Sequence, residues 1–438
     1  MKVLKFGGTS VGSAQRMKDV VKLIAGERKI VVLSAMSGTT NTLVNIADYL
    51  YKKNPDGAAE TINSLAIKYD GVVEELYSTD KYKQQAKAIL KEHFDFLRSF
   101  AKSNVVFTSV EEKAILAQGE LLSTNMVTLY LLETGVNAVL LPALDYMKID
   151  KNSEPEPAFI RKSLLALLEK NANADIYITQ GFICRNAYGE IDNLLRGGSD
   201  YSASLVGAAV NAEEIQIWTD IDGMHNNDPR FVQGTKPVSN LHFEEAAELA
   251  YFGAKILHPT CVLPAKLANI PVRLLNTMDP TAYGTMISNV CETGKIKAVA
   301  AKDNITAIKI KSGRMLLAYG FMRRIFEIFE SYKTPIDMIT TSEVGVSLTI
   351  DNAKHLNEIV DELKKFGTVM VDENLVIICV VGDMNSENVG FQAQVVNALK
   401  NIPIRMVSYG GSNYNISFLV KAEHKEKALN ALSDNLFK

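Results

Sequence analysis

A short glycine-rich segment near the start of the chain places a cation beside flexible backbone. Residues 5–10 read KFGGTS, so Lys5 ends an apolar strand, and Gly7 and Gly8 precede a predicted helix. Backbone N–H groups in such a turn can approach an anion, and a helix N-terminus favours negative charge. The segment matches neither a Walker loop nor a dinucleotide-binding fingerprint. It predicts a phosphate site, with a plain glycine turn and a solvated lysine as the alternative.

The segment 194–200, LLRGGSD, is the most specific motif in the chain, because it places an arginine and an aspartate on either side of two glycines and a serine. Arg196 can bind a carboxylate through two parallel hydrogen bonds. A capped turn is the plainer alternative, yet a turn alone needs neither an arginine nor an aspartate beside paired glycines. The segment therefore predicts a clamp for a small anionic substrate, formed by Arg196, Gly197, Gly198, Ser199 and Asp200.

Two further segments carry groups that suit an amino acid. Residues 34–41, SAMSGTTN, follow a predicted strand, and the hydroxyls of Ser34 and Thr40 are candidates to hold a carboxylate. In isolation, the favoured interpretation of this cluster is a helix cap. Glu120 lies in an apolar helical context, where a carboxylate is costly to bury unless it meets a cation. That cation is either a ligand ammonium or an internal Lys or Arg, and the residues leave both open.

The segments 218–223 and 228–230 supply hydroxyl, carboxylate and guanidinium groups after a buried strand, around what could be a nucleotide pocket. Lys255 lies in the apolar segment 252–259. Phosphoryl transfer depends mainly on positioning and on neutralising charge, so Lys5 and Lys255 are candidate clamps beside a magnesium ion. A carboxylate acceptor is already ionised at neutral pH and needs no general base, which makes two histidines weaker candidates: His225 and His258.

The elements expected to position these groups alternate between strand and helix, as in a parallel sheet covered by helices. Residues 56–101 are charged and helical in period, which predicts a helical insertion. The α/β pattern extends to about residue 288. Expected strands are 3–6, 30–34, 138–141, 176–179 and 215–219, and expected helices include 14–25 and one from about residue 41.

An internal repeat of roughly 70 residues follows residue 296. Its copies span 305–366 and 375–436, and each predicts a βαββα unit. A small sheet must cover its edge, either with the other copy or with a second chain. The repeat therefore predicts a small-molecule sensor that also serves for dimerisation.

Composition excludes several classes of protein. The chain has 438 residues, of which 47% are hydrophobic and 22% charged, with a net charge of −3. This length predicts more than one domain, and the charge lacks the basic excess of a nucleic-acid binder. Four cysteines lie far apart without a Cys-x-x-Cys pair, so neither a disulfide framework nor a metal site is indicated. Without a signal-peptide pattern or an apolar run of about 20 residues, we expect a cytoplasmic protein outside membranes.

Taken together, the segments 5–10, 196–200, 218–230 and 252–255 resemble those of the aspartate kinases, members of the amino acid kinase superfamily. The C-terminal repeat resembles the tandem ACT domains of that family, and residues 336–344 resemble the effector segment of its lysine-sensitive monofunctional type. The resemblance implies an α/β amino acid kinase fold, an open and mainly parallel sheet with helices on both faces, followed by two α+β ferredoxin-like ACT units. It implies a catalytic domain at 1–290 and ACT domains at 298–370, which the C-terminal segment could complete, and at 371–438.

The resemblance also implies the reaction: ATP would phosphorylate the side-chain carboxylate of L-aspartate, the first step towards lysine, threonine and methionine. Glu120 would bind the ammonium of aspartate, and Arg196 its α-carboxylate. The residues implied for ATP, which would bring magnesium, are Lys5, Gly7, Gly8, Thr219, Asp220, His225, Arg230 and Lys255. Those implied for aspartate are Ser34, Thr40, Glu120, Arg196, Gly197, Gly198, Ser199 and Asp200, and the implied catalytic residues are Lys5, Asp200 and Lys255.

Feedback inhibition, with L-lysine as the expected effector, is implied as well. His225 stands where lysine-sensitive relatives have a tyrosine, and in the sensor Ala318 and Pro335 depart from the family's pattern. The implied assembly is a homodimer through the ACT domains or a homotetramer, without nucleic acid, membrane or a protein-held metal. The implied regulatory residues are Met315, Gly320, Met322, Asp337, Thr341, Ser342 and Glu343.

Three alternatives stand beside this interpretation, and the third, a nicotinamide dehydrogenase, is disfavoured by the missing dinucleotide-binding fingerprint. Another amino acid kinase, such as a glutamate or carbamate kinase, would share the glycine loops, but the tandem C-terminal units argue against it. A catalytically dead amino-acid sensor would share the whole fold. Against that second alternative, four charged residues of the motifs are intact: Lys5, Arg196, Asp200 and Lys255.

Overall fold

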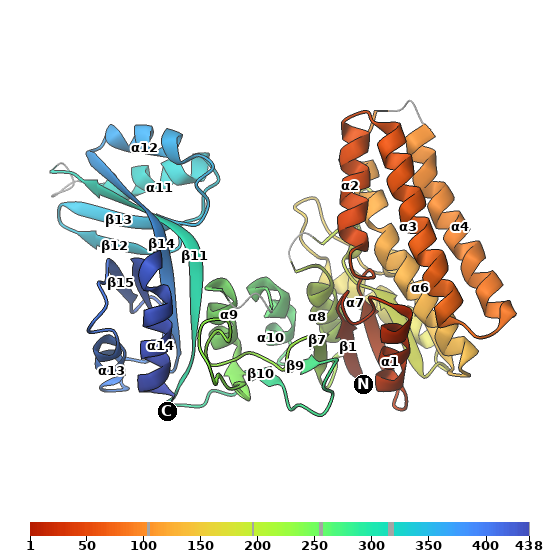
Figure 1. Ribbon diagram of the computed structural model, residues 1–438. Coiled ribbons are helices and arrows are strands. Elements are labelled where there is room, and N and C mark those ends of the chain that lie inside the picture. The colour runs from red at the N-terminus through yellow and green to blue at the C-terminus, as the bar shows by residue number, and fades with distance from the viewer. Residues whose placement is uncertain (103–105, 195–196, 254–256, 314–318, 438) are drawn as a thin grey trace. The chain divides into compact units, whose positions relative to one another are not determined.

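The computed structural model in Figure 1 describes residues 1–102, 106–194, 197–253, 257–313 and 319–437. Contacts group the chain into two units, and each is described by itself. The first unit comprises Met1–Gly223 and Leu257–Asn289, and the second comprises Met224–Ile256 and Val290–Lys438. The domain boundaries expected from the sequence stay predictions.

The first unit is built on a mainly parallel sheet, because its strands are short, apolar and buried on both faces. Every residue of β2, KIVVL, is buried. Within the unit the strand order is β3-β4-β2-β1-β7-β9-β10, and only β10 runs antiparallel to its neighbour. The strands are β1 (Lys2–Phe6), β2 (Lys29–Leu33), β3 (Ala138–Leu141), β4 (Ile176–Gln180), β7 (Ile215–Thr219), β9 (Val272–Asn276) and β10 (Thr285–Ser288).

Helices cover both faces of this sheet. Leu4, Phe6 and Val31 share one core with helices α1 to α4 and α6, whereas α8 packs against β1, β2 and β7 outside that core. The helices are α1 (Ala14–Ile24), α2 (Thr39–Tyr51), α3 (Pro55–Leu76), α4 (Asp80–Lys102), α5 (Ser109–Leu116), α6 (Gln118–Glu133), α7 (Pro157–Lys170), α8 (Gly198–Val210) and α10 (Leu263–Leu267). Three-residue and four-residue 3-10 turns lie at Ala143–Asp145 and Pro259–Val262, and a short hairpin joins β5 (Ile183–Arg185) to β6 (Ile191–Asn193).

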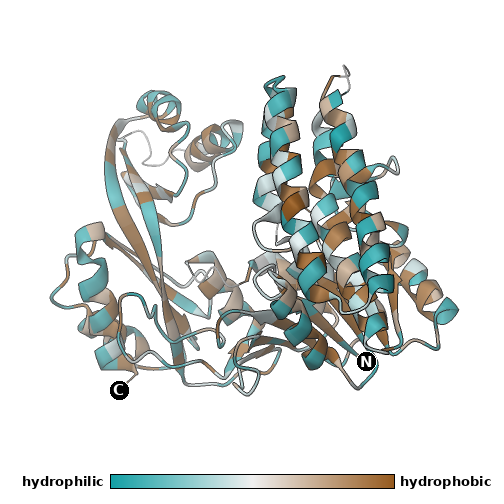
Figure 2. Ribbon diagram, turned by 45° about the vertical axis from the view of Figure 1, so that its right-hand side comes forward, coloured by the Kyte–Doolittle hydropathy of each residue, from teal (hydrophilic) through white to brown (hydrophobic). Residues whose placement is uncertain are grey.

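The predicted helical insertion forms α3 and α4, which lie side by side (Figure 1). Buried residues of α4 recur three or four positions apart, which gives the helix one apolar face and one polar face (Figure 2). The apolar residues are Ala86, Leu90, Phe94 and Leu97. The insertion therefore packs firmly onto the sheet-covering helices instead of extending freely.

The second unit is built on an antiparallel sheet in the order β12-β13-β11-β14-β16-β15. Its central strands, β11 (Ile296–Lys311) and β14 (Thr368–Gly382), are much longer than the others and pass through both repeat copies. The remaining strands are β12 (Ile339–Ser342), β13 (Gly345–Ile350), β15 (Met406–Tyr409) and β16 (Asn415–Lys421), with β8 (Asn240–His242) outside this sheet. The helices are α9 (Phe243–Tyr251), α11 (Phe321–Ser331), α12 (Leu356–Lys364), α13 (Phe391–Ala398) and α14 (Lys425–Leu436), with a 3-10 turn at Ala422–His424.

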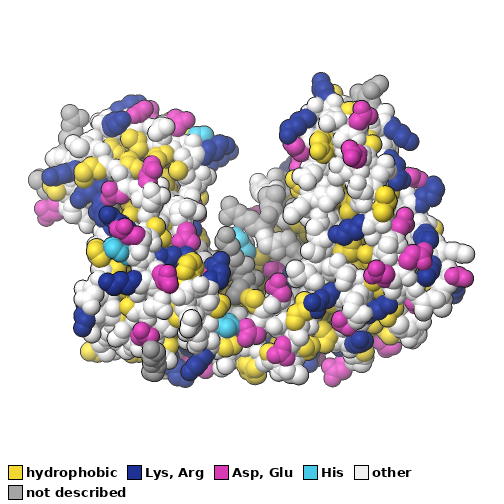
Figure 3. Space-filling model, viewed as in Figure 1, with side chains coloured by type: hydrophobic (Ala, Val, Ile, Leu, Met, Phe, Trp, Pro, Cys, Tyr) yellow, Lys and Arg dark blue, Asp and Glu magenta, His cyan; other side chains and the backbone are white. Residues whose placement is uncertain are grey.

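Each repeat copy has its own hydrophobic core. Helices α11 and α12 cover Ile308 and Ile310 of β11, and helices α13 and α14 cover Val376, Ile378 and Val380 of β14. The predicted fold class, a parallel α/β region followed by two α+β units, is thus confirmed. Positive and negative side chains are interspersed on the visible face of each unit (Figure 3). No helix in the described ranges combines the length and apolarity needed to span a membrane.

Candidate active site

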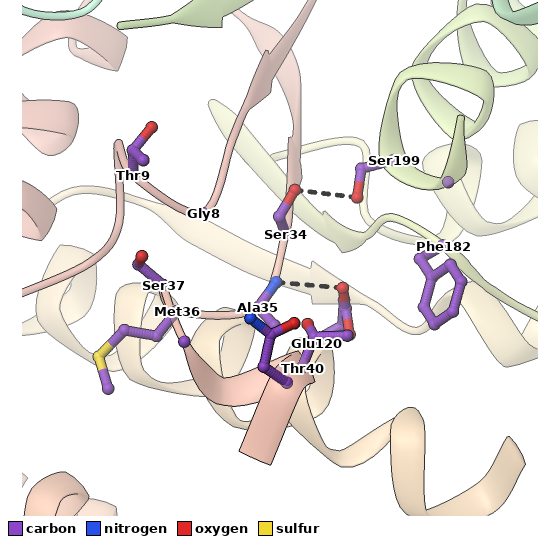
Figure 4. Close-up of a pocket in the computed structure, with 13 residues that line it drawn as sticks. Gly8, Thr9, Ser34, Ala35, Met36, Ser37, Thr40, Glu120, Phe182 and Ser199 are labelled. Carbon is purple, nitrogen blue, oxygen red and sulfur yellow. Dashed lines mark hydrogen bonds between the residues drawn. The ribbon is translucent and has the colours of Figure 1, made fainter. Parts of the chain in front are cut away.

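A cavity of about 430 Å³ lies beyond the carboxyl ends of β1, β2 and β4, the edge where open α/β sheets bind ligands. Its volume suits a small metabolite. The loop after β2 forms most of one wall, and the loop after β1 and the start of α8 complete it (Figure 4). The lining residues are Gly8, Thr9, Ser34, Ala35, Met36, Ser37, Gly38, Thr40, Asn41, Glu120, Phe182, Gly198 and Ser199.

Two distant glycine-rich segments of the sequence meet at this edge. The Nζ atom of Lys5, on β1, lies 2.7 Å from Oδ1 of Asp200, in the first turn of α8. Both side chains are mostly buried, with 10% and 17% of their surface exposed. At Gly8 a side chain would not fit, because a Cβ atom there would lie 2.9 Å from the carbonyl oxygen of Ala35. The backbones of the loops after β1 and β2 therefore approach each other closely at Gly8.

Glu120 brings a buried carboxylate to the cavity. Only 4% of the residue is exposed, and its Oε1 accepts a hydrogen bond from the backbone N–H of Ala35 at 3.1 Å (Figure 4). Its Oε2 has no hydrogen-bond partner among the residues that the structure describes. Burial raises the pKa of this carboxyl to about 7, although the amide of Ala35 and the charge of Lys5 act in the opposite direction. An ammonium group at Oε2 would satisfy both the charge and the unpaired oxygen.

The hydroxyl groups predicted for substrate binding face the same cavity. Ser34 Oγ donates to Ser199 Oγ at 2.9 Å, and Ser34 and Thr40 both line the wall. Helix α2 begins after Gly38 without a side-chain cap. The helix-cap interpretation of residues 34–41, favoured from the sequence in isolation, is therefore wrong, because no hydroxyl of this loop caps the helix.

The predicted nucleotide residues divide between the two units. In the first, β7 lies beside β1, and the backbone N–H of Gly7 donates to the carbonyl oxygen of Trp218 at 3.3 Å. Thr219 is the last residue of β7, and Asp220 follows it directly. In the second, His225 bonds Thr235 through Nδ1 at 2.9 Å. There Arg230 pairs with Asp228 at 2.7 Å, with 75% of the arginine side chain exposed.

Two predicted charge clamps, Arg196 and Lys255, lie outside the described residues, as does Met315 of the sensor. The sequence also missed a cavity residue. Phe182 adopts φ 66°, unusual for a bulky side chain, and its N–H donates to Ser202 Oγ at 2.9 Å. Backbone strain of this kind concentrates at functional sites. The Gly181-Phe182 pair directly after a buried strand was the only sequence signal for it.

In the second unit, the predicted regulatory residue Asp337 is buried, with 1% of its side chain exposed. Its Oδ1 accepts hydrogen bonds from the Tyr251 hydroxyl at 2.8 Å and from Lys302 Nζ at 2.7 Å. Its Oδ2 has no partner within the described ranges. Lys302 also contacts Asp351 at 2.9 Å. Desolvation raises the pKa of Asp337, and the Lys302 ammonium opposes that rise.

The other predicted regulatory residues lie along neighbouring elements. Gly320 precedes α11, and Met322 packs from that helix against the first repeat's core. Thr341 and Ser342 end β12, and Glu343 follows in the turn to β13. Ser342 Oγ donates to the carbonyl oxygen of Gly345 at 3.4 Å, a contact within the turn between β12 and β13.

Known proteins resemble the chain over its whole length. The Amino acid kinase family profile matches residues 1–276, and an ACT domain profile matches residues 378–436. Lysine-sensitive aspartokinase 3 of Escherichia coli (strain K12) is 33% identical over 99% of both chains. The solved structure of E. coli aspartokinase III with aspartate and ADP, in the R-state, is similar over 100% of both chains with a TM-score of 0.84 and 32% identity. The corresponding T-state complex with lysine and aspartate also covers 100% of both chains, with a TM-score of 0.83 and 33% identity.

Proposed function

Since the chain belongs to the amino acid kinase family, and within it to the aspartokinases, we propose that it transfers the γ-phosphoryl group of ATP to the side-chain carboxylate of L-aspartate. The products are 4-phospho-L-aspartate and ADP. One observation of the described residues carries the substrate assignment: a buried carboxylate, Glu120, presents an unpaired oxygen to a cavity that also contains hydroxyl groups. An α-amino acid supplies the ammonium that this oxygen lacks.

In this proposal each side of the substrate has its own partners. Glu120 Oε2 receives the ammonium of aspartate, while Ser34 and Thr40 offer hydroxyls to a carboxylate. Arg196 keeps its predicted role on the α-carboxylate. The start of α8, with Gly197, Gly198 and Ser199, would then bring backbone and hydroxyl donors to the same group, because a helix N-terminus favours an anion.

The chemical step needs little covalent help from the protein. A side-chain oxygen of ionised aspartate attacks the γ-phosphorus, the new O–P bond forms, and the bond to the bridging oxygen breaks as ADP leaves. Lys5 neutralises charge on the transferring group, and Asp200 holds the Lys5 ammonium in place at 2.7 Å. We assign Lys255 a second neutralising role, with Gly7, Gly8, Thr219, Asp220, His225 and Arg230 as nucleotide contacts.

Magnesium fits this scheme as a companion of the nucleotide. The described residues contain no cluster of three or more His, Cys, Asp or Glu side chains suited to a metal ion. We therefore propose that Mg²⁺ arrives on the ATP phosphates and adds to the charge neutralisation there.

Regulation by L-lysine is the second part of the proposal. The E. coli relative has been solved with lysine bound, and Asp337 here offers one unpaired oxygen in a buried setting. The internal ammonium of Lys302 already holds the other oxygen. An effector ammonium would therefore either bind Asp337 beside the Lys302 ammonium or displace that ammonium. Assembly through the ACT units and a cytoplasmic location stay predictions from the sequence.

A coupled ADP-release assay with L-aspartate and MgATP tests the activity, with hydroxylamine trapping of the acyl phosphate as confirmation. We expect ADP and hydroxamate to form together with L-aspartate and neither to form with L-glutamate. ADP release that is independent of aspartate, or that needs another amino acid, would overturn the assignment. Addition of L-lysine, L-threonine or L-methionine separately tests the effector, and we expect lysine alone to inhibit.

A further inference from the structure

Helix α3 of the insertion contacts the cavity loop through two consecutive residues. The Tyr69 hydroxyl lies 3.0 Å from Oγ1 of Thr39, and Nζ of Lys68 donates to the carbonyl oxygen of Ser37 at 3.0 Å. Tyr69 and Thr39 are completely buried. The two contacts thus flank Gly38, the residue at which the cavity loop turns into α2.

Gly38 forms the turn between the cavity loop and α2. Its φ of 82° lies in the left-handed region, which favours glycine, and it precedes Thr39, the first residue of α2, without a side-chain cap for the helix. Ser37, Gly38 and Thr40 line the cavity, whereas Thr39 faces away from it towards Tyr69. The turn at Gly38 has no side-chain cap, and the two contacts from α3 hold it on the side away from the cavity.

The opposite end of the same loop is held by α6. Ser123 Oγ donates to the carbonyl oxygen of Ser34 at 2.8 Å, and the backbone N–H of Ala35 donates to Glu120. Burial raises the pKa of Tyr69, which keeps its hydroxyl neutral and able to donate at physiological pH. The loop 34–41 is therefore clamped at both ends by helices, one of which belongs to the insertion.

We propose that Tyr69 and Lys68 are positioning residues for aspartate binding: they fix the turn at Gly38 and so the placement of the Ser37–Thr40 wall, without touching either substrate. This inference rests on the proposed function, because it assumes that the cavity receives aspartate. It also gives the insertion a part in the reaction, since α3 sets the shape of the substrate wall from outside the sheet.

Tyr69→Phe tests the first contact, because it removes one buried hydroxyl and keeps the ring. Tyr77→Phe is the matched control: Tyr77 follows the last residue of α3, is 3% exposed, and donates from its hydroxyl to the carbonyl oxygen of Met126 at 2.8 Å. Each variant loses one buried hydrogen bond, so both should lower the melting temperature similarly. Only Tyr69→Phe should raise KM for L-aspartate, by about fivefold, with kcat and KM for ATP changed less than about twofold.

Lys68→Met tests the second contact against Lys18→Met. Lys18 also donates from Nζ to a backbone carbonyl oxygen, that of Glu75 at 2.7 Å, away from the cavity. We expect a rise of about twofold in KM for L-aspartate with Lys68→Met and none with Lys18→Met. Thr39→Val should reproduce Tyr69→Phe, and the double variant should be no worse than either single one, because both remove the same hydrogen bond.

The proposal is overturned if Tyr69→Phe leaves KM for L-aspartate unchanged, raises both substrate KM values equally, or behaves like Tyr77→Phe. These outcomes are distinct from failure of the proposed function, which the unaltered enzyme alone decides. A wild-type chain that phosphorylates aspartate while Tyr69→Phe shows a normal KM refutes only the positioning role.

Discussion

Glu120 in the first unit and Asp337 in the second are both buried carboxylates, but different partners hold them. Each has one oxygen held and one without a partner among the described residues. At Glu120 the held oxygen accepts from an uncharged backbone amide, whereas at Asp337 it accepts from the Lys302 ammonium and from Tyr251. A buried charge without a counter-charge favours an incoming cation, while a paired one is already largely satisfied. The comparison teaches that the described residues place no cation on the unpaired oxygen of Glu120, which supports the proposed ammonium site, whereas Asp337 already holds the internal ammonium of Lys302.

The largest effect is expected from Lys302→Met. This change leaves Asp337, like Glu120, as a buried carboxylate held only by an uncharged donor. Loss of one partner from a buried ion pair costs about 3 kcal/mol, so the free energy of unfolding should fall by that amount at pH 7 in urea titrations. The difference in the free energy of unfolding between the variant and the wild type should become smaller at low pH, because protonated Asp337 needs no cation. Lys364→Met removes an exposed partner of Asp361 and should change stability by less than about 0.5 kcal/mol. Equal stability of both variants would contradict the paired state of Asp337.

Glu120→Gln removes the negative charge that we propose binds the ammonium group of aspartate. We expect KM for L-aspartate to rise about a hundredfold, with KM for ATP nearly unchanged, in steady-state kinetics. The folded protein should not suffer, because an ionised, unpaired carboxylate is itself unfavourable in the core. A drop in melting temperature at pH 8, or equal damage to both substrates, would argue against an ammonium site.

The pH dependence sharpens the same point. Glu120 has a pKa of about 7, above the ordinary value of 4.5, because burial disfavours its ionised form. The free energy of unfolding therefore falls as pH rises from 4.5 through 7, and in the proposed function the substrate ammonium binds only the ionised form of Glu120. KM for L-aspartate should rise about tenfold from pH 8 to pH 6. The profile should be flat in Glu120→Gln, and a titration that persists in that variant would assign the proton elsewhere.

The smallest effect is expected from Tyr251→Phe. The change removes one donor from Asp337 and leaves Lys302 in place, so unfolding should cost about 0.5 to 1 kcal/mol less. Tyr188→Phe, at an exposed position, serves as the control in the same urea titrations. A loss as large as that of Lys302→Met would mean that the tyrosine, and not the lysine, satisfies the carboxylate.

The sequence predicted the two glycine loops and Glu120 because chemistry and local pattern coincide there. A phosphate-binding turn and a costly buried carboxylate can both be predicted from local residue types, without knowledge of distant contacts. The structure brings the residues concerned to one cavity: Gly8, Ser34, Glu120 and Ser199. Their individual roles stay predictions. The contact of Tyr69 with Thr39 was out of reach, because helical period shows which face is buried but not which loop it meets.

For a similar reason, the sequence pattern understates the length of the first strand in each repeat copy. Residues 305–311 and 375–381 show clear strand patterns, but Lys302-Asp303-Asn304 interrupts the pattern before the first of them. In the structure β11 continues through that interruption by a register shift between Lys302 and Ile305, with Asn304 at φ 60°. Cross-strand pairing with β14 supports residues that have no strand signal of their own.

The two repeat copies share the long strands β11 and β14. β11 contributes Val299 to one core and Ile308 to the other, with the irregular stretch between them. No separate linker joins the two cores at this point, because the paired strands β11 and β14 run from one core into the other. Lys302 lies at the start of that irregular stretch and pairs with Asp337, so a ligand that displaces this ion pair would act at the part of β11 that joins the two cores.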